Sequence, residues 1–69
     1  MVEVFKTNVH RVEMADQLVS TLLVHFPFSM INFDLEDCDK ILRIEDKEVC
    51  AESIIELMNL KGFACEVLD

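Results

Sequence analysis

The sequence predicts an α+β fold in which two helices cover one face of a four-stranded antiparallel sheet. Apolar residues alternate with polar ones in four short segments and recur every three or four positions in two longer ones. The resulting order is strand, helix, strand, strand, helix, strand. A turn-rich segment joins two strand–helix–strand halves, which is typical of the ferredoxin-like βαββαβ arrangement. The 69 residues are expected to form one domain, 1–69.

The first half contains a predicted strand at Val2–Asn8, rich in β-branched and aromatic residues. Strict alternation places Phe5 opposite the neighbouring valines, so the face that it occupies stays open. A helix is expected from about residue 11 to residue 26. Its apolar stripe consists of Ala15, Leu18, Val19, Leu22, Leu23 and Phe26. Pro27 disfavours helical geometry at the preceding residue and is expected to end the helix.

Two alternating segments, 31–36 and 42–45, predict half-buried strands joined by a hairpin. Between them, Asp37–Lys40 supplies turn-forming side chains. A second helix is expected to start between residues 46 and 50, with Asp46 as its N-cap. Gly62, the only glycine, stands where a left-handed residue would end that helix. A last strand is expected at 64–68.

Composition limits the classes of partner. Fourteen acidic residues against six basic ones give a formal net charge of −8. This charge argues against binding to nucleic acid and to anionic membranes, and it favours basic protein partners or cations. The longest apolar stretch, Leu18–Phe28, is too short and too often interrupted to span a bilayer. Three cysteines without paired spacing favour reduced thiols and a cytoplasmic location.

The segment between the first strand and the first helix carries a family resemblance. Met14 is followed by apolar residues four and eight positions later, and three further stretches accompany this pattern. They are Phe33-Asp34-Leu35, Asp39-Lys40-Ile41-Leu42 and Lys61-Gly62-Phe63. Together they resemble the heavy-metal-associated domains of copper and zinc chaperones and transport ATPases. The resemblance covers essentially the whole chain and implies the same ferredoxin-like fold.

The resemblance breaks at the metal ligands. Many members of that family carry G-M-x-C-x-x-C at this junction. Here Asn8 takes the glycine position, Val9 the position of the buried methionine, and His10 precedes the first ligand. Arg11 and Met14 occupy the two cysteine positions. The resemblance therefore implies an inherited scaffold whose metal motif is degenerate.

These substitutions change the chemistry. A thiolate pair binds Cu(I) or Zn(II) because sulfur is soft and anionic. Arg11 is a permanent cation without a lone pair, and the thioether of Met14 alone is a weak ligand. We therefore expect no metal and no cofactor. The alternative is a divergent metal-binding or metal-transport site for Cu(I) or Zn(II), built from His10, Glu13 and Met14.

Other chemistry is weakly supported. The acidic stretch Asp34–Glu45 spans twelve residues, but the glycine that a calcium loop needs at its sixth position is Asp39. Cys50, near a helix start, and Cys38, in the hairpin, leave a reactive-thiol protein as a further alternative. No acid, base and nucleophile converge in the predicted fold, so we expect a protein that is not an enzyme.

The expected function is that of a small protein-interaction module, with another protein or a second copy as partner. One candidate surface is the loop at the start of the first helix together with the segment that follows the second helix. Its residues are Asn8, Val9, His10, Glu13, Lys61, Gly62 and Phe63. The open face of the sheet and the edge strand at 64–68 are two other candidates, because both can support pairing.

Overall fold

The computed structural model describes residues 1–68 and contains the six expected elements in the expected order. They are β1 (Val2–Thr7), α1 (Val12–His25), β2 (Met30–Asp34), β3 (Ile41–Glu45), α2 (Ala51–Leu60) and β4 (Cys65–Val67). Asp69 lies outside the described residues. Neither helix in residues 1–68 has the length and apolar character that crossing a membrane requires.

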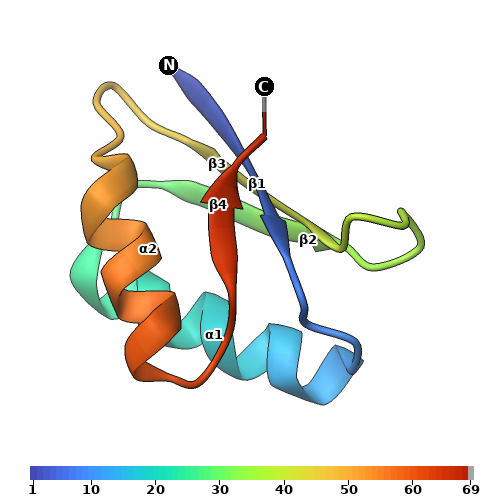
Figure 1. The fold of residues 1–69 in the computed structure, drawn as a ribbon. Coiled ribbons are helices and arrows are strands. Elements are labelled where there is room, and N and C mark those ends of the chain that lie inside the picture. The colour runs from blue at the N-terminus through green and yellow to red at the C-terminus, as the bar shows by residue number, and fades with distance from the viewer. Residues whose placement is uncertain (69) are drawn as a thin grey trace.

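The four strands form one antiparallel sheet in the order β2-β3-β1-β4, so β2 and β4 are its edges. Both helices lie on the same side of this sheet (Figure 1). The predicted α+β class and ferredoxin-like arrangement are therefore confirmed. The β1–α1 connection lies at the opposite end of β1 from the N-terminus (Figure 1).

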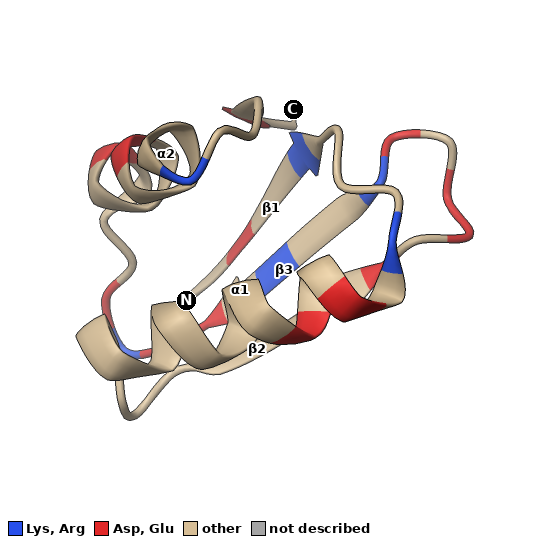
Figure 2. Cartoon of the chain, turned by 90° about the horizontal axis from the view of Figure 1, so that it is seen from below, with Lys and Arg blue, Asp and Glu red and all other residues tan. Residues whose placement is uncertain are grey.

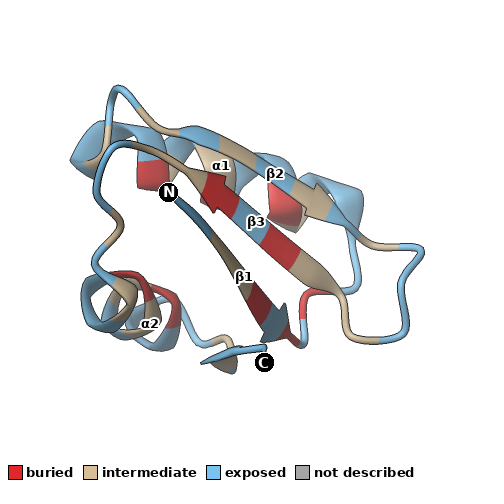
Figure 3. Cartoon of the chain, turned by 90° about the horizontal axis from the view of Figure 1, so that it is seen from above, coloured by how far each residue is buried: buried red, intermediate tan, exposed pale blue. Residues whose placement is uncertain are grey.

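The core lies between the sheet and the helices, where the buried positions of both layers face each other (Figure 3). Its residues are Phe5, Val9, Ala15, Leu18, Leu22, Leu42, Ile44, Ile54 and Met58. The open question about β1 is thereby answered. Phe5 and Thr7 are buried, whereas Val2 is exposed, so Phe5 faces the helices and the preceding valines face the open side. Because successive side chains of a strand point to opposite faces, this also determines the face on which each remaining side chain of β1 lies.

Helix α1 ends as predicted, and α2 begins later than its expected N-cap. The N–H of Phe26 donates to the carbonyl of Leu22 at 2.8 Å, and Pro27 follows immediately. The N-cap of α2 is Cys50, so the assignment of Asp46 as N-cap was wrong. Asp46 stays beside the sheet, because its N–H donates to the carbonyl of Met1 at 3.0 Å and its carboxylate accepts from the hydroxyl of Ser29.

The end of α2 agrees with the prediction, and β4 is shorter than predicted. Gly62 has a φ of 91°, the left-handed geometry expected after a helix, and its N–H donates to the carbonyl of Asn59. Ala64 lies outside β4 because its N–H donates to the side-chain oxygen of Asn8 at 2.9 Å and not to the sheet. Leu68 still contacts β1, with its N–H 2.9 Å from the carbonyl of Val4.

Candidate functional site

The β1–α1 loop, residues 8–11, is anchored at its base. The hydroxyl of Thr7 accepts a hydrogen bond from the N–H of Val9 at 3.2 Å and donates to the carbonyl of Lys40. Val9 is completely buried. Its side chain therefore supports the loop from within and cannot itself contact a partner. Asn8 and His10 on either side are exposed.

The side chain of Arg11 points into solvent. The side chains of Arg11 and Glu13 are 75% and 71% exposed, and Nε of Arg11 lies 3.4 Å from Oε2 of Glu13. Such an exposed pair contributes little to stability. Arg11 is the N-cap of α1 in extended geometry, with no side-chain hydrogen bond to the helix. The guanidinium therefore neutralises a first-turn carboxylate at the surface.

The side chain of Met14 points toward the interior. Its half-buried side chain packs against the core and lines a small cavity of about 230 Å³. Phe63 and Lys61 line the same cavity, whereas His10 and Glu13 do not. No contact of the described residues gathers the three side chains of the alternative metal site. The carboxylate of Glu13 lies beside the guanidinium of Arg11, which repels cations.

The structure does bring the two segments of the predicted interaction loop together. The hydrogen bond from Ala64 to Asn8 and the cavity shared by Met14 and Phe63 place residues 61–64 beside the start of α1. Lys61 and Gly62 are exposed, and Phe63 is half-buried against the core. The surface of this region is accordingly polar, apart from Val12, which is 64% exposed.

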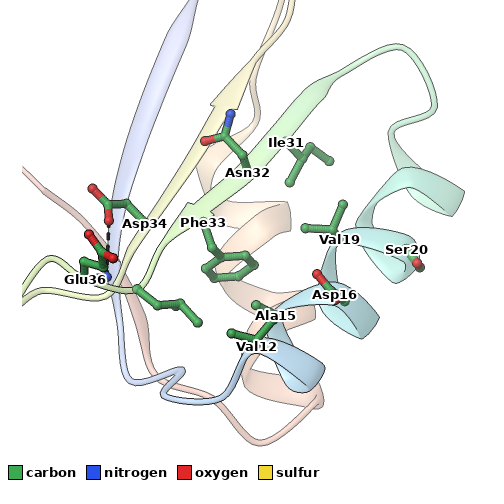
Figure 4. A pocket seen from close by; sticks show the side chains of 11 residues that line it. Val12, Ala15, Asp16, Val19, Ser20, Ile31, Asn32, Phe33, Asp34 and Glu36 are labelled. Carbon is green, nitrogen blue, oxygen red and sulfur yellow. Dashed lines mark hydrogen bonds between the residues drawn. The ribbon is translucent and has the colours of Figure 1, made fainter.

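A larger hollow runs along the other flank of α1. It has a volume of about 740 Å³ and lies between α1 and the edge strand β2. We call it the α1–β2 groove. It is lined by Val12, Ala15, Asp16, Val19, Ser20, Ile31, Asn32, Phe33, Asp34, Leu35 and Glu36. In Figure 4 the ring of Phe33 points toward Val12 and Ala15, and Ile31 points toward Val19. The floor of the groove is therefore apolar.

The rim of the α1–β2 groove is acidic. Asp16, Asp34 and Glu36 line it, and no Lys or Arg does. The salt bridges within residues 1–68 pair Lys6 with Asp39 and join Arg11 to Glu13 and Arg43 to Glu45, so none neutralises these three carboxylates. The acidic residues of the first turns of α1 and of the β2–β3 loop lie at the same end of the molecule (Figure 2). The groove is therefore an apolar hollow in an anionic surface.

Sequence analysis did not identify this groove. The signal was present in two parts: alternating apolar residues at 31, 33 and 35, and the ferredoxin-like topology that places the second strand at an edge. Half-buried apolar residues on an edge strand have no further strand to cover them. Combining the two parts would have pointed to the flank of α1.

The three cysteines are free and differ in environment. The N–H of Ser53 and its hydroxyl, 3.2 Å from Sγ, lower the pKa of the exposed thiol of Cys50, the hydroxyl having the larger effect. Burial raises the pKa of the half-buried Cys65 to about 11. Cys38 is exposed between Asp37 and Asp39, and the ligand atoms of these three residues lie within 4.8 Å of one another.

The cluster around Cys38 is explained by the turn that it occupies. Oδ1 of Asp37 accepts the N–H of Asp39 at 2.9 Å, and the carboxylate of Asp39 lies 3.9 Å from the ammonium group of Lys6. Lys40 closes the turn with a φ of 47°. The two carboxylates thus stabilise the hairpin and its contact with β1.

Comparison with known proteins adds no relative. No protein-family model, no curated protein and no solved structure matches this chain.

Proposed function

We propose that this protein is a small, non-enzymatic module that binds another protein, built on a scaffold of the heavy-metal-associated type whose metal motif is degenerate. The observation that carries the proposal is the α1–β2 groove, an apolar hollow beside the free edge of β2. Within residues 1–68, strand β2 pairs only with β3, and none of the loop and turn backbone hydrogen bonds involves residues 30–34. The outer edge of β2 can therefore accept another chain.

The chemistry of the groove supports binding over catalysis. Its lining contains no His, Cys, Lys or Arg, so it holds neither a nitrogen base nor a thiol nucleophile. Its three carboxylates lie at an exposed rim, and its floor consists of aliphatic and aromatic side chains. Such a floor and rim match the apolar centre and polar border of protein interfaces.

The side chains at the start of α1 support the proposal that the metal motif is degenerate. Arg11 is exposed and paired with Glu13, and Met14 lies in the cavity beside Phe63. The alternative, Cu(I) or Zn(II) held by His10, Glu13 and Met14, has no contact of its own in its favour. We place the protein in the cytoplasm, because exposed free thiols such as Cys38 and Cys50 persist in a reducing compartment.

Capture from a lysate of the source organism tests the proposal. The immobilised chain is compared with Val19→Lys, which brings a long cation into the groove, and with Val24→Lys, a matched change at a 79% exposed position outside it. We expect a stoichiometric partner that the Val19→Lys variant loses and the Val24→Lys variant retains. Retention by both variants would place the partner elsewhere, for example on the loop at residues 8–13.

Two further measurements define failure. A chain that stays monomeric over a concentration series in light scattering, and that captures no partner, would leave the module without support. Anaerobic titration with Cu(I) and Zn(II), followed by amide chemical shifts, examines the metal alternative. Saturable micromolar or tighter binding centred on residues 8–14 and Gly62 would replace the proposal with a metal-handling function.

A further inference from the structure

We infer that the partner segment is an extended, basic peptide that adds to the free edge of β2 as a fifth strand and inserts its apolar side chains into the α1–β2 groove. This inference rests on the proposed function and deepens it by naming the class of ligand and its mode of binding. It depends on three features of the described residues: the geometry of the edge, the apolar floor and the charge of the rim.

The geometry of the edge favours an extended ligand. Met30–Asp34 contributes five residues to the sheet, a length of about 16 Å at 3.3 Å per residue. Along β2, exposed and half-buried side chains alternate, and the half-buried Ile31 and Phe33 face α1 (Figure 4). A strand added beside β2 would follow the same alternation, so every second side chain would point over the groove.

The floor favours apolar side chains at those alternate positions. Phe33 and Ile31 pack against the core from one wall, and Val19 lines the opposite wall on α1. Covering these half-exposed surfaces removes apolar area from water, which favours binding. The backbone of the added strand supplies hydrogen bonds that do not depend on its sequence, while the groove selects the side chains.

The rim favours basic side chains at the remaining positions. Asp16 and Glu36 line the groove from α1 and from the turn after β2, and Asp34 lies on the open side of the same edge. No Lys or Arg lines the groove, and the chain as a whole carries a net charge of −8. Lys40 lies next to this edge, because its ammonium group donates to the carbonyl of Leu35 at 2.8 Å, but the three carboxylates outnumber it. A cationic peptide is therefore attracted to the edge, and long-range attraction raises its association rate.

The same charge argues against a second copy as the occupant. Pairing two β2 edges would bring two sets of these carboxylates together, and each copy carries the same net negative charge. Like charges across an edge pairing are destabilising. The other edge, β4, has only three residues and offers a shorter ladder. A basic segment of another chain at β2 can pair with the free backbone groups of the edge, cover the apolar floor and neutralise the carboxylates of the rim.

Selection from a library of random ten-residue peptides displayed on phage, with the full chain as bait, tests the inference. We expect enriched peptides in which Lys or Arg alternates with β-branched or aromatic residues. Synthetic versions are titrated by fluorescence anisotropy. Hydrogen exchange then shows whether bound peptide protects amides of residues 30–34 that exchange freely in the unbound protein.

A charge-matched pair of variants separates the rim from overall charge. Asp16→Asn with Glu36→Gln removes two carboxylates at the groove, and Glu52→Gln with Glu56→Gln removes two exposed ones from α2. We expect the first pair to weaken binding roughly threefold to tenfold and the second to change it less than about twofold. Equal effects of both pairs would overturn the specific role of the rim.

The remaining outcomes separate this inference from the function on which it rests. Enriched peptides that are acidic, or that perturb the loop at 8–13 and not β2, would overturn the inference while a protein-binding function stands. A dimer in sedimentation, with residues 30–34 protected before peptide is added, would assign the edge to a second copy. Failure to enrich any peptide would count against the inference. If the capture experiment also yielded no partner, the proposed function would be overturned as well.

Discussion

Helix α1 borders two regions that differ in how the sequence builds them. The β1–α1 loop at its start comes from one continuous stretch, and except for the buried Val9 its side chains are exposed and polar. The α1–β2 groove along its flank takes residues from α1, β2 and the turn that follows, and its floor is apolar. The comparison teaches that two surfaces beside one helix can differ in character, because one is built from consecutive polar residues and the other from apolar residues of separate elements.

The largest expected effect concerns the single buried residue of the loop. Val9→Asp places a carboxylate where the side chain is completely buried, which we expect to cost several kcal/mol of unfolding free energy. His10→Asp, at the exposed neighbouring position, is expected to change it by less than about 0.5 kcal/mol. Urea unfolding followed by circular dichroism measures both. Similar costs would mean that the loop is not anchored through Val9.

Restoring the two cysteines examines the family resemblance itself. Arg11→Cys with Met14→Cys recreates the C-x-x-C spacing and removes the cation that repels a metal. If the scaffold is of the heavy-metal-associated type, the double variant should bind Cu(I) roughly 100-fold more tightly than the unchanged chain or the single variant Arg11→Cys. Anaerobic competition with a Cu(I) chelator measures the difference. Equal affinities would remove the main support for the resemblance.

The outcome at residues 8–14 shows what sequence reasoning can reach. The left-handed geometry of Gly62 followed from its place after the second helix, whereas the burial of Val9 was only what the family resemblance implied. The geometry of Gly62 depends on backbone sterics, and the helix before it depends on local periodicity, which a sequence displays directly. The element order depends on the same signals and was confirmed.

The rest depended on contacts between distant residues. Asp46 has the side chain of a good N-cap, but the hydroxyl of Ser29 and the carbonyl of Met1 hold it at the sheet, so the N-cap lies four residues later, at Cys50. Likewise the acidic rim combines Asp16 with Glu36, twenty positions apart. Only the packing of α1 against β2 brings such residues together, and no local sequence pattern predicts that packing.

A matched pair of phenylalanines tests the floor of the groove. Phe33→Ala removes a half-buried ring that packs against the core, and we expect a loss of about 1 to 2.5 kcal/mol, below the 3 to 5 typical of a fully buried ring. Phe28→Ala makes the same change at a 90% exposed position and should cost less than about 0.5 kcal/mol. Chemical denaturation of both variants measures the contrast, which would vanish if Phe33 were not packed.

Cys65 in β4, at the other edge of the sheet, is expected to make the free energy of unfolding depend on pH. Burial raises the pKa of Cys65 from its ordinary 9.0 to about 11, so the folded state favours the protonated thiol. The stabilisation is complete below pH 9 and is lost as the pH rises toward 11. For a half-buried group we expect roughly 1 kcal/mol after solvent screening. The difference in unfolding free energy between the unchanged chain and Cys65→Ala, measured from pH 8 to 11, isolates this contribution. A constant difference would contradict it.

The smallest expected effect is at Arg11, on the surface of the β1–α1 loop. Arg11→Ala removes an exposed side chain whose only salt bridge within residues 1–68 joins it to the equally exposed Glu13. We expect a change in unfolding free energy of less than about 0.5 kcal/mol in 0.15 M salt, because water and ions screen such a pair. Glu13→Gln should match it, and the double variant should add nothing beyond the two single changes. Thermal unfolding of the three variants measures this coupling. A cost above about 1 kcal/mol would show that the side chain of Arg11 stabilises the start of α1. The polar side chains of the loop would then contribute to stability, as the apolar side chains along the groove do.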